Sequence, residues 1–153
     1  MNMRNCRNLL LAAAVLVALS SCSDKAQIKG TLTGASDTQV VVKQLSGNTL
    51  VALDTLKTDA SGAYSCKIDV LKGQPQFVYL FKGDTKVASL LLQKGDKVKV
   101  VSDTLGMYSV EGSEESEKLR QVDEDFAAFM DKFSVDAAAG DNAAASKDYI
   151  DYY

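Results

Sequence analysis

Apolar and polar residues alternate along the chain from residue 26 to residue 111, and turn-forming residues interrupt the alternation at short intervals. Alternation of this kind turns one face of each strand towards a core, and frequent turns are typical of antiparallel sheets. We predict eight strands, at about 26–33, 38–45, 49–57, 63–70, 77–82, 86–93, 97–102 and 107–111. The expected fold class is therefore mainly β, an antiparallel β-sandwich of about eight strands.

Two of the predicted strands have an ambiguous pattern. Residues 88–92 are almost continuously apolar, which also suits a helix. Their short length and the flanking Gly-Asp turns favour a strand, which we place at the centre of a sheet and covered on both faces. Phe77, Tyr79 and Phe81 share one face of the fifth strand, and we predict that they face the core. The alternative is an aromatic groove that holds a peptide or a glycan.

A helix is predicted to follow Gly112, giving the sandwich a C-terminal α-helical extension. Ser113 suits the cap of a helix N-terminus, and acidic residues follow it where the helix dipole favours negative charge. Apolar residues then recur at helical spacing, which predicts one stripe packed on an open face or edge of the sandwich. The stripe consists of Leu119, Val122, Phe126, Phe129, Met130 and Phe133. The alanine-rich segment 137–145 suits either a short helix or a flexible connector.

The start of the chain has the pattern of an exported lipoprotein. Arg4 and Arg7 precede an apolar run at 9–19, which is shorter than the roughly 20 residues that a membrane-spanning helix needs. The sequence Leu-Ser-Ser-Cys at 19–22 then matches a bacterial lipobox. We predict that Cys22 is lipidated, becomes the first residue of the mature chain and attaches it to a membrane.

These patterns divide the chain into four parts. They are a signal peptide at 1–21, a lipidated tether at 22–25, a β-sandwich at 26–112 and an acidic helical extension at 113–153. Lipidation implies a location in the cell envelope, for which we expect the outer membrane. The sequence leaves open whether the domain faces the periplasm or the outside.

The composition excludes several kinds of chemistry. The chain has no histidine, which excludes Ser-His-Asp and Cys-His nucleophiles and the usual zinc sites. Cys66 would be the one thiol left after lipidation and signal cleavage, and its place on an apolar strand face predicts a core cysteine. The acidic runs at 111–117 and 123–125 do not converge as a calcium site requires. We therefore expect no metal, no cofactor and no catalysis.

Charge is unevenly distributed between the two parts of the mature chain. Residues 23–102 carry eleven lysines against seven aspartates, whereas residues 103–153 carry four basic against thirteen acidic residues. We expect the acidic part to form a solvated helix surface; the alternative is that it docks onto the basic part. No arginine-rich or aromatic-interleaved stretch is present, so nucleic acid is not an expected partner.

Four segments occur in an order that points to a known family. They are 28–32, 54–64, 91–96 and 110–113, which look like its opening strand, central hairpin, late Gly-Asp turn and closing segment. In this order they resemble a β-rich domain of unknown function from lipoproteins of Bacteroidota. The resemblance implies a domain that commonly precedes a thioredoxin-like domain of the TlpA/AhpC type. This sequence has no redox dithiol, so the chemistry of that second domain is not carried over.

The last residues are unusually apolar for a chain end. Tyr149, Ile150, Tyr152 and Tyr153 are candidates for docking a partner; the alternatives are packing onto the sandwich or the border of a longer protein. Together these features predict a lipid-anchored binding or scaffolding module. Its expected partner is a protein, such as a thioredoxin-like domain, bound through a sheet edge or the acidic tail. Alternatives are the positioning domain of a truncated or split thiol–disulfide oxidoreductase and a glycan-binding accessory lipoprotein.

Overall fold

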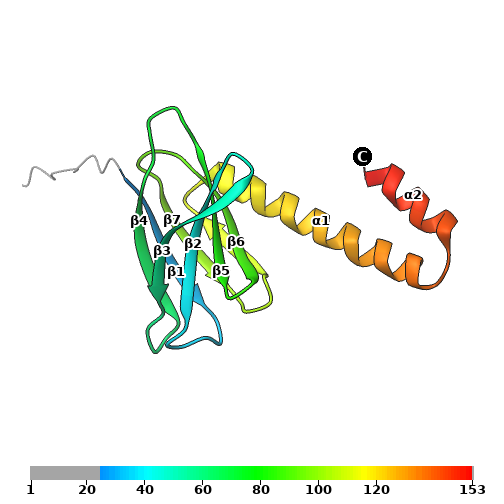
Figure 1. Cartoon of the computed structure of the whole chain (residues 1–153), viewed down its shortest axis with the longest axis horizontal. Helices are drawn as coiled ribbons and strands as arrows, with labels where there is room; N and C mark the ends of the chain where they lie inside the picture. The colour runs from blue at the N-terminus through cyan, green and yellow to red at the C-terminus, as the bar shows by residue number, and fades with distance from the viewer. Residues whose placement is uncertain (1–24, 153) are drawn as a thin grey trace, which may run out of the picture.

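The structure, a computed structural model, describes residues 25–152 and shows two packed β-sheets followed by two helices (Figure 1). The elements are β1 Lys25–Leu32, β2 Gln39–Ser46, β3 Thr49–Lys57, β4 Ala63–Asp69, β5 Gln76–Lys82, β6 Thr85–Leu92, β7 Lys97–Ser102, β8 Tyr108–Glu111, α1 Glu114–Ala138 and α2 Asn142–Tyr152. One sheet has the order β4-β1-β7-β8, and the other has the order β3-β2-β5-β6. The predicted mainly β sandwich with a helical extension is confirmed.

The core lies between the two sheets and is built from alternate residues of their strands. Ile28 and Leu32 of β1 are completely buried, as are Val42, Leu80 and Leu90 of the facing sheet. Burying one such aliphatic side chain contributes about 1.5–3 kcal/mol. Strand β3 takes little part in this core, because every residue of it except Leu56 is exposed.

One strand pair departs from the antiparallel pattern. β1 pairs with β4 in the antiparallel sense but with β7 in the parallel sense, with Gln27 opposite Lys97. The chain crosses to the other sheet after β1 and returns for β4 and again for β7, and this crossing makes β1 and β7 run in the same direction. Alternation alone does not reveal strand direction, so this parallel pair could not be predicted from the sequence.

Residues 88–92 do form a strand, but its predicted central position is wrong. β6 lies at the edge of its sheet, and it is covered because α1 runs beside it. The hydroxyl of Ser116, which is fully buried, donates to the Leu91 carbonyl at 3.1 Å and accepts from the Leu91 N–H at 3.1 Å. The start of α1 therefore satisfies backbone groups that the edge of β6 would otherwise expose.

Helix α1 begins where the sequence predicted. Ser113 has the extended backbone of an N-cap, and its hydroxyl accepts from the Ser116 N–H at 3.3 Å. The helix continues past the predicted end at residue 133 to Ala138. Gly140 then adopts a φ of +76°, and α2 folds back beside α1 (Figure 1). The alanine-rich segment therefore forms the end of one helix, a turn and the start of the next.

The predicted packing of the apolar helix stripe is only partly right. α1 contacts β6 and β8 near its start and then extends away from the sandwich (Figure 1). Val122, Phe126 and Met130 are 57%, 47% and 43% exposed. Helical spacing identified the stripe, but a 25-residue helix is longer than the sheet edge that it covers, so its second half meets α2 instead of the sandwich.

Candidate interaction surfaces

The lipidation site predicted at Cys22 lies outside the described residues, and so does Tyr153. Within residues 25–152, no helix has both the length and the apolar character needed to cross a bilayer. The same residues contain no group of three or more histidine, cysteine, aspartate or glutamate side chains that could hold a metal ion. The candidate features described below are surfaces of the sandwich and its helices.

Cys66 is a core residue, as its place on the fourth strand predicted. Its side chain points between the sheets and is a free, buried thiol. Burial raises the pKa of the Cys66 thiol to about 11, and the carboxylate of Asp54 adds to the effect. Because the thiolate is the reactive form, this environment makes the thiol a poor nucleophile at neutral pH.

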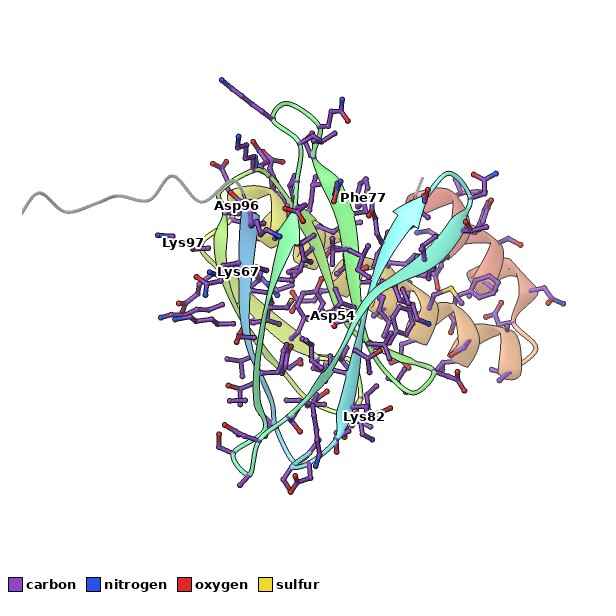
Figure 2. The ribbon with its side chains drawn as sticks, turned by 60° about the vertical axis from the view of Figure 1, so that its left-hand side comes forward. Asp54, Lys67, Phe77, Lys82, Asp96 and Lys97 are labelled. Carbon is purple, nitrogen blue, oxygen red and sulfur yellow. The ribbon has the colours of Figure 1, made fainter. Side chains whose placement is uncertain are left out.

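The aromatic residues of β5 do not face the core, so the prediction of core packing for them is wrong. Val78 and Leu80 are completely buried, and the residues between and beside them lie on the outer face of the sheet. Phe77 is 39% exposed there (Figure 2), and the ammonium of Lys43 lies 4.2 Å from the centre of the Phe81 ring. All five residues at 77–81 are apolar, so the sequence did not indicate which alternate set points inwards.

Strand β3 is an exposed, apolar sheet edge. Leu50, Val51 and Leu53 are 46%, 48% and 41% exposed, and they lie on a strand with β2 as its one partner in the sheet. The register of β3 against β2 shifts beside Leu53, which marks a β-bulge. Natural proteins usually protect such an edge with charge, proline or a covering segment. Strand β3 lacks this protection along its first half.

The C-terminal aromatic residues divide between packed and exposed positions. The ring of Tyr152 stacks on Phe129 of α1, with centroids 4.4 Å apart, and meets Phe126 edge-on at 6.2 Å. Tyr149 and Ile150 are 55% and 72% exposed. The predicted docking residues are therefore not one surface, because Tyr152 helps to hold α2 against α1. Their role in binding a partner stays a prediction.

A polar cluster fixes α1 to both sheets. The Asp123 carboxylate accepts from Lys86 of β6 at 2.9 Å and from the hydroxyl of Tyr108 of β8 at 2.9 Å. Burial by itself raises the pKa of Asp123, but the polar groups of Ser89, Lys86 and Tyr108 outweigh this effect and hold it below the usual value. The sequence did not single out Asp123, because it lies in an acidic run that looked uniformly solvated.

We expect Asp123→Ala to lower the free energy of unfolding by about 1–2 kcal/mol, because it leaves the partly buried Tyr108 hydroxyl without its acceptor. The stabilisation from the carboxylate is present above its unfolded-state pKa near 3.8 and is lost as the pH falls through the lowered folded-state value. Urea unfolding at pH 7 and at acid pH measures both effects. Asp125→Ala, on the exposed side of the same helix, should change stability by less than about 0.5 kcal/mol. Equal effects would show that the cluster does not hold α1.

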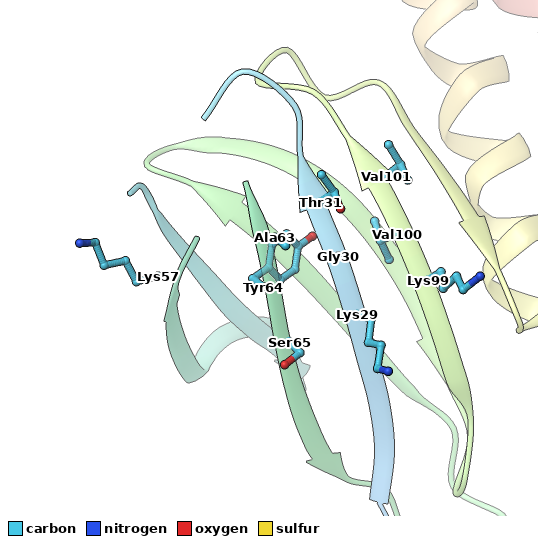
Figure 3. A pocket seen from close by; sticks show the side chains of 10 residues that line it. All are labelled: Lys29, Gly30, Thr31, Lys57, Ala63, Tyr64, Ser65, Lys99, Val100 and Val101. Carbon is cyan, nitrogen blue, oxygen red and sulfur yellow. The ribbon is translucent and has the colours of Figure 1, made fainter. Parts of the chain in front are cut away.

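The outer face of the other sheet is basic and slightly hollow. An open hollow of about 650 Å³ lies over β4, β1 and β7, and Lys29, Ser65 and Lys99 are among the residues that line it (Figure 3). Strand pairing places Lys29 beside both Ser65 and Lys99, and Gln27 beside Lys67 and Lys97. From the sequence, each of these lysines could be placed only on the outer face of its own strand. The register of the three strands shows that they lie side by side.

No curated protein matches this chain. The model of a family described as a domain of unknown function, DUF4369, matches residues 26–119. The matched residues include the strands of both sheets and the first turns of α1, which cover β6 and carry Ser116. This match extends over well over half of the chain, and the chain therefore belongs to the DUF4369 family of domains of unknown function.

Proposed function

We propose that this protein is a lipid-anchored module of the cell envelope that binds a protein partner through strand β3 and has no catalysis of its own. The observation that carries the proposal is the exposed apolar edge formed by the first half of β3. An extended segment of a partner can add a strand to such an edge. Main-chain hydrogen bonds then supply affinity, and the side chains on either face supply specificity.

The surroundings of β3 support binding on the outer face of its sheet. Leu45 of β2 pairs with Leu50 and is 38% exposed, so the apolar surface continues from the edge onto the neighbouring strand. Phe77 is exposed on the same outer face. Soluble proteins rarely leave an edge and an adjoining apolar face open together unless something binds there.

The absence of catalysis is proposed from the polar groups that the structure describes. The pKa of the Cys66 thiol is raised by burial, and the carboxylate of Asp123 is engaged by Lys86 and Tyr108. The open hollow over β4, β1 and β7 is lined mainly by lysines, small polar residues and valines.

Attachment to the envelope is proposed from the lipobox, together with the position of the first strand. Lys25 is the first residue of β1, three residues after Cys22, so an acylated Cys22 would place the sandwich directly at the bilayer. Two or more acyl chains on one residue give stable membrane attachment. We place the domain at the outer membrane, on either its periplasmic or its outer face.

Site-specific photocrosslinking in the native host tests the proposed binding edge. A photoreactive amino acid at Val51 should give one or more discrete adducts with another protein. Val101, which is 52% exposed on the outer face of β7, serves as the matched control and should give none. Leu53→Lys, which places a charge on the edge, should remove the Val51 adducts while leaving the unfolding curve nearly unchanged. Adducts of equal yield at both positions, or none at Val51, would contradict the proposal.

A glycan is the second candidate ligand, because the aromatic residues of β5 lie on the outer face of their sheet. Aromatic rings exposed in this way are able to stack on sugar rings. This candidate predicts saturable binding to an oligosaccharide that is lost in Tyr79→Ala with folding intact. Tyr149→Ala, which removes an exposed ring on α2, is the control. Loss of binding in both variants, or in neither, would count against a glycan site on β5.

The intact mass of the protein extracted from its own membranes separates the anchored binding module from the oxidoreductase alternative. A mass equal to acylated residues 22–153 supports the anchor and a stand-alone module. A much larger polypeptide would favour a positioning domain at the head of a redox protein. An unacylated chain would remove the anchor from the proposal.

A further inference from the structure

One end of the sandwich gathers basic residues around the start of β1. Strand pairing places Lys25 opposite Asp69 at the end of β4 and Gln27 beside Lys97 at the start of β7. The loops at 70–75 and 93–96 connect strands at this same end. Figure 2 shows Lys67 and Lys97 beside the first residues of β1.

The length of the tether fixes how far this end can be from the lipidation site. Two residues separate Cys22 from Lys25, and the three Cα–Cα steps between them span at most about 11 Å. This distance is comparable with the thickness of the headgroup layer on one side of a bilayer, about 5–8 Å. The step rests on the proposed function, because it uses an acylated Cys22 as the anchor.

The charges at this end are not balanced within the described chain. Lys67, Lys72 and Lys97 are exposed and make no ion pair with any residue from 25 to 152. Asp69 is paired with Lys25 at 2.9 Å, and Asp96 accepts from the Gln93 N–H of its own turn at 2.9 Å. Among the nearby glutamates, Glu111 pairs with Lys99, whereas Glu114 and Glu115 share Lys118.

The tip of the 70–75 loop adds an apolar residue to this basic surface. Leu71 is 63% exposed, and Lys72 follows it directly. An exposed apolar side chain flanked by lysines suits the boundary between headgroups and acyl chains, where the leucine enters the bilayer and the ammonium groups meet anionic lipids.

The loops at the opposite end of the sandwich are acidic, although Lys57, Lys82 and Lys86 lie at the strand ends beside them. Each of its four loops carries an aspartate, at positions 37, 59, 84 and 103. Lys57 is already paired with Asp37 at 2.9 Å. An anionic surface therefore attracts one end of the sandwich and repels the other, which gives the domain a preferred orientation.

We propose that the end formed by Lys67, Leu71, Lys72 and Lys97 is a membrane-facing surface. It docks on the anionic phospholipid headgroups of the bilayer that holds the lipid anchor. The sandwich then stands with β1 roughly along the membrane normal and the four aspartate-bearing loops away from the membrane. The first half of β3 starts at this same end, so its apolar edge lies close to the membrane and is open to partners from the side, as are the outer faces of both sheets.

The first test measures orientation in the full acylated protein. It is reconstituted in vesicles of phosphatidylethanolamine and phosphatidylglycerol that contain brominated acyl chains. A fluorophore is attached to Leu71→Cys or, as the matched control, to Leu105→Cys, a leucine 85% exposed at the opposite end. We expect quenching at position 71 to exceed that at position 105 by about two-fold or more. Charge reversal of Lys67, Lys72 and Lys97 to glutamate should remove the difference. Equal quenching at the two positions, with the protein still on the vesicles, would overturn the proposal and leave the anchor intact.

The second test does not depend on the anchor. The mature chain, residues 22–153, with Cys22→Ser is mixed with vesicles of pure phosphatidylglycerol or pure phosphatidylcholine, and bound protein is measured by sedimentation. We expect salt-sensitive binding to the anionic vesicles alone. Loss of each lysine should weaken binding about five-fold, so the triple charge reversal should weaken it about 100-fold or more. The matched reversal of three lysines elsewhere, Lys29, Lys43 and Lys82, should have a smaller effect. Equal binding to both vesicle types, or an equal effect of the two triple variants, would reject the membrane-facing surface even if native Cys22 proves to be unacylated.

Discussion

Replacing Gly62 with alanine should destabilise the sandwich by about 2–4 kcal/mol. Gly62 ends the turn between β3 and β4 with a φ of +82°, and a Cβ atom there would lie 2.3 Å from the Leu32 carbonyl oxygen. The neighbouring backbone cannot move aside easily, because the Leu32 N–H donates to the Gly62 carbonyl at 2.9 Å. The substitution therefore combines an unfavourable backbone conformation with a clash against a fixed strand.

Gly47 provides the matched control for this prediction. It also has a positive φ, +58°, but a Cβ atom at this position would meet nothing within 4 Å. Gly47→Ala should cost only the left-handed conformation, about 1–2 kcal/mol. Urea unfolding of the two variants separates the conformational effect from the clash. An equal loss of stability in both would show that the turn next to Leu32 has room that the structure does not give it.

The second large effect concerns which alternate residues of β5 face the core. Leu80 is completely buried between the sheets, so Leu80→Ala should lower the free energy of unfolding by about 2–5 kcal/mol. Tyr79 lies on the outer face and is only partly covered. Tyr79→Ala should lower stability by about 1 kcal/mol or less, although it removes a larger side chain. The size of the residue and the size of the effect are thus expected to run in opposite directions.

Thermal or chemical unfolding of the two variants measures this difference directly. If Phe77, Tyr79 and Phe81 faced the core, as predicted from the sequence, Tyr79→Ala would be the more damaging substitution. Leu80→Ala would then be nearly neutral. The same experiment also supplies the folding control for the glycan test. A Tyr79→Ala variant is informative about binding only when it is shown to be folded.

Strand positions were predictable because the two faces of most strands differ in polarity. In β4, Tyr64, Cys66 and Ile68 alternate with exposed polar residues, and the structure buries the predicted face. Residues 77–81 lack this contrast, so periodicity located β5 but not its inner face. The thin space between the sheets is filled by Val78 and Leu80, and the bulkier rings lie outside.

Properties that depend on contacts between distant segments were not predictable in this way. The edge position of β6 depends on which strand pairs with β5, and its cover depends on where α1 lies. Asp123 shows the same limit: its neighbours on β6 and β8 are distant in sequence, and its own segment reads as a solvated helix surface. The exposed apolar edge of β3 was also hidden, because its residues resemble those of an ordinary buried strand.

The parallel pairing of β1 with β7 determines when the domain can fold. β1 is the first strand to be synthesised, yet both of its partners come much later: β4 begins at Ala63 and β7 at Lys97. Contacts between such distant segments form slowly, because a long loop must close before any pairing is gained. The first sheet therefore cannot assemble until residues up to about 102 have left the ribosome. On the proposed export route, the chain is expected to remain unfolded until almost the whole sandwich has crossed the membrane.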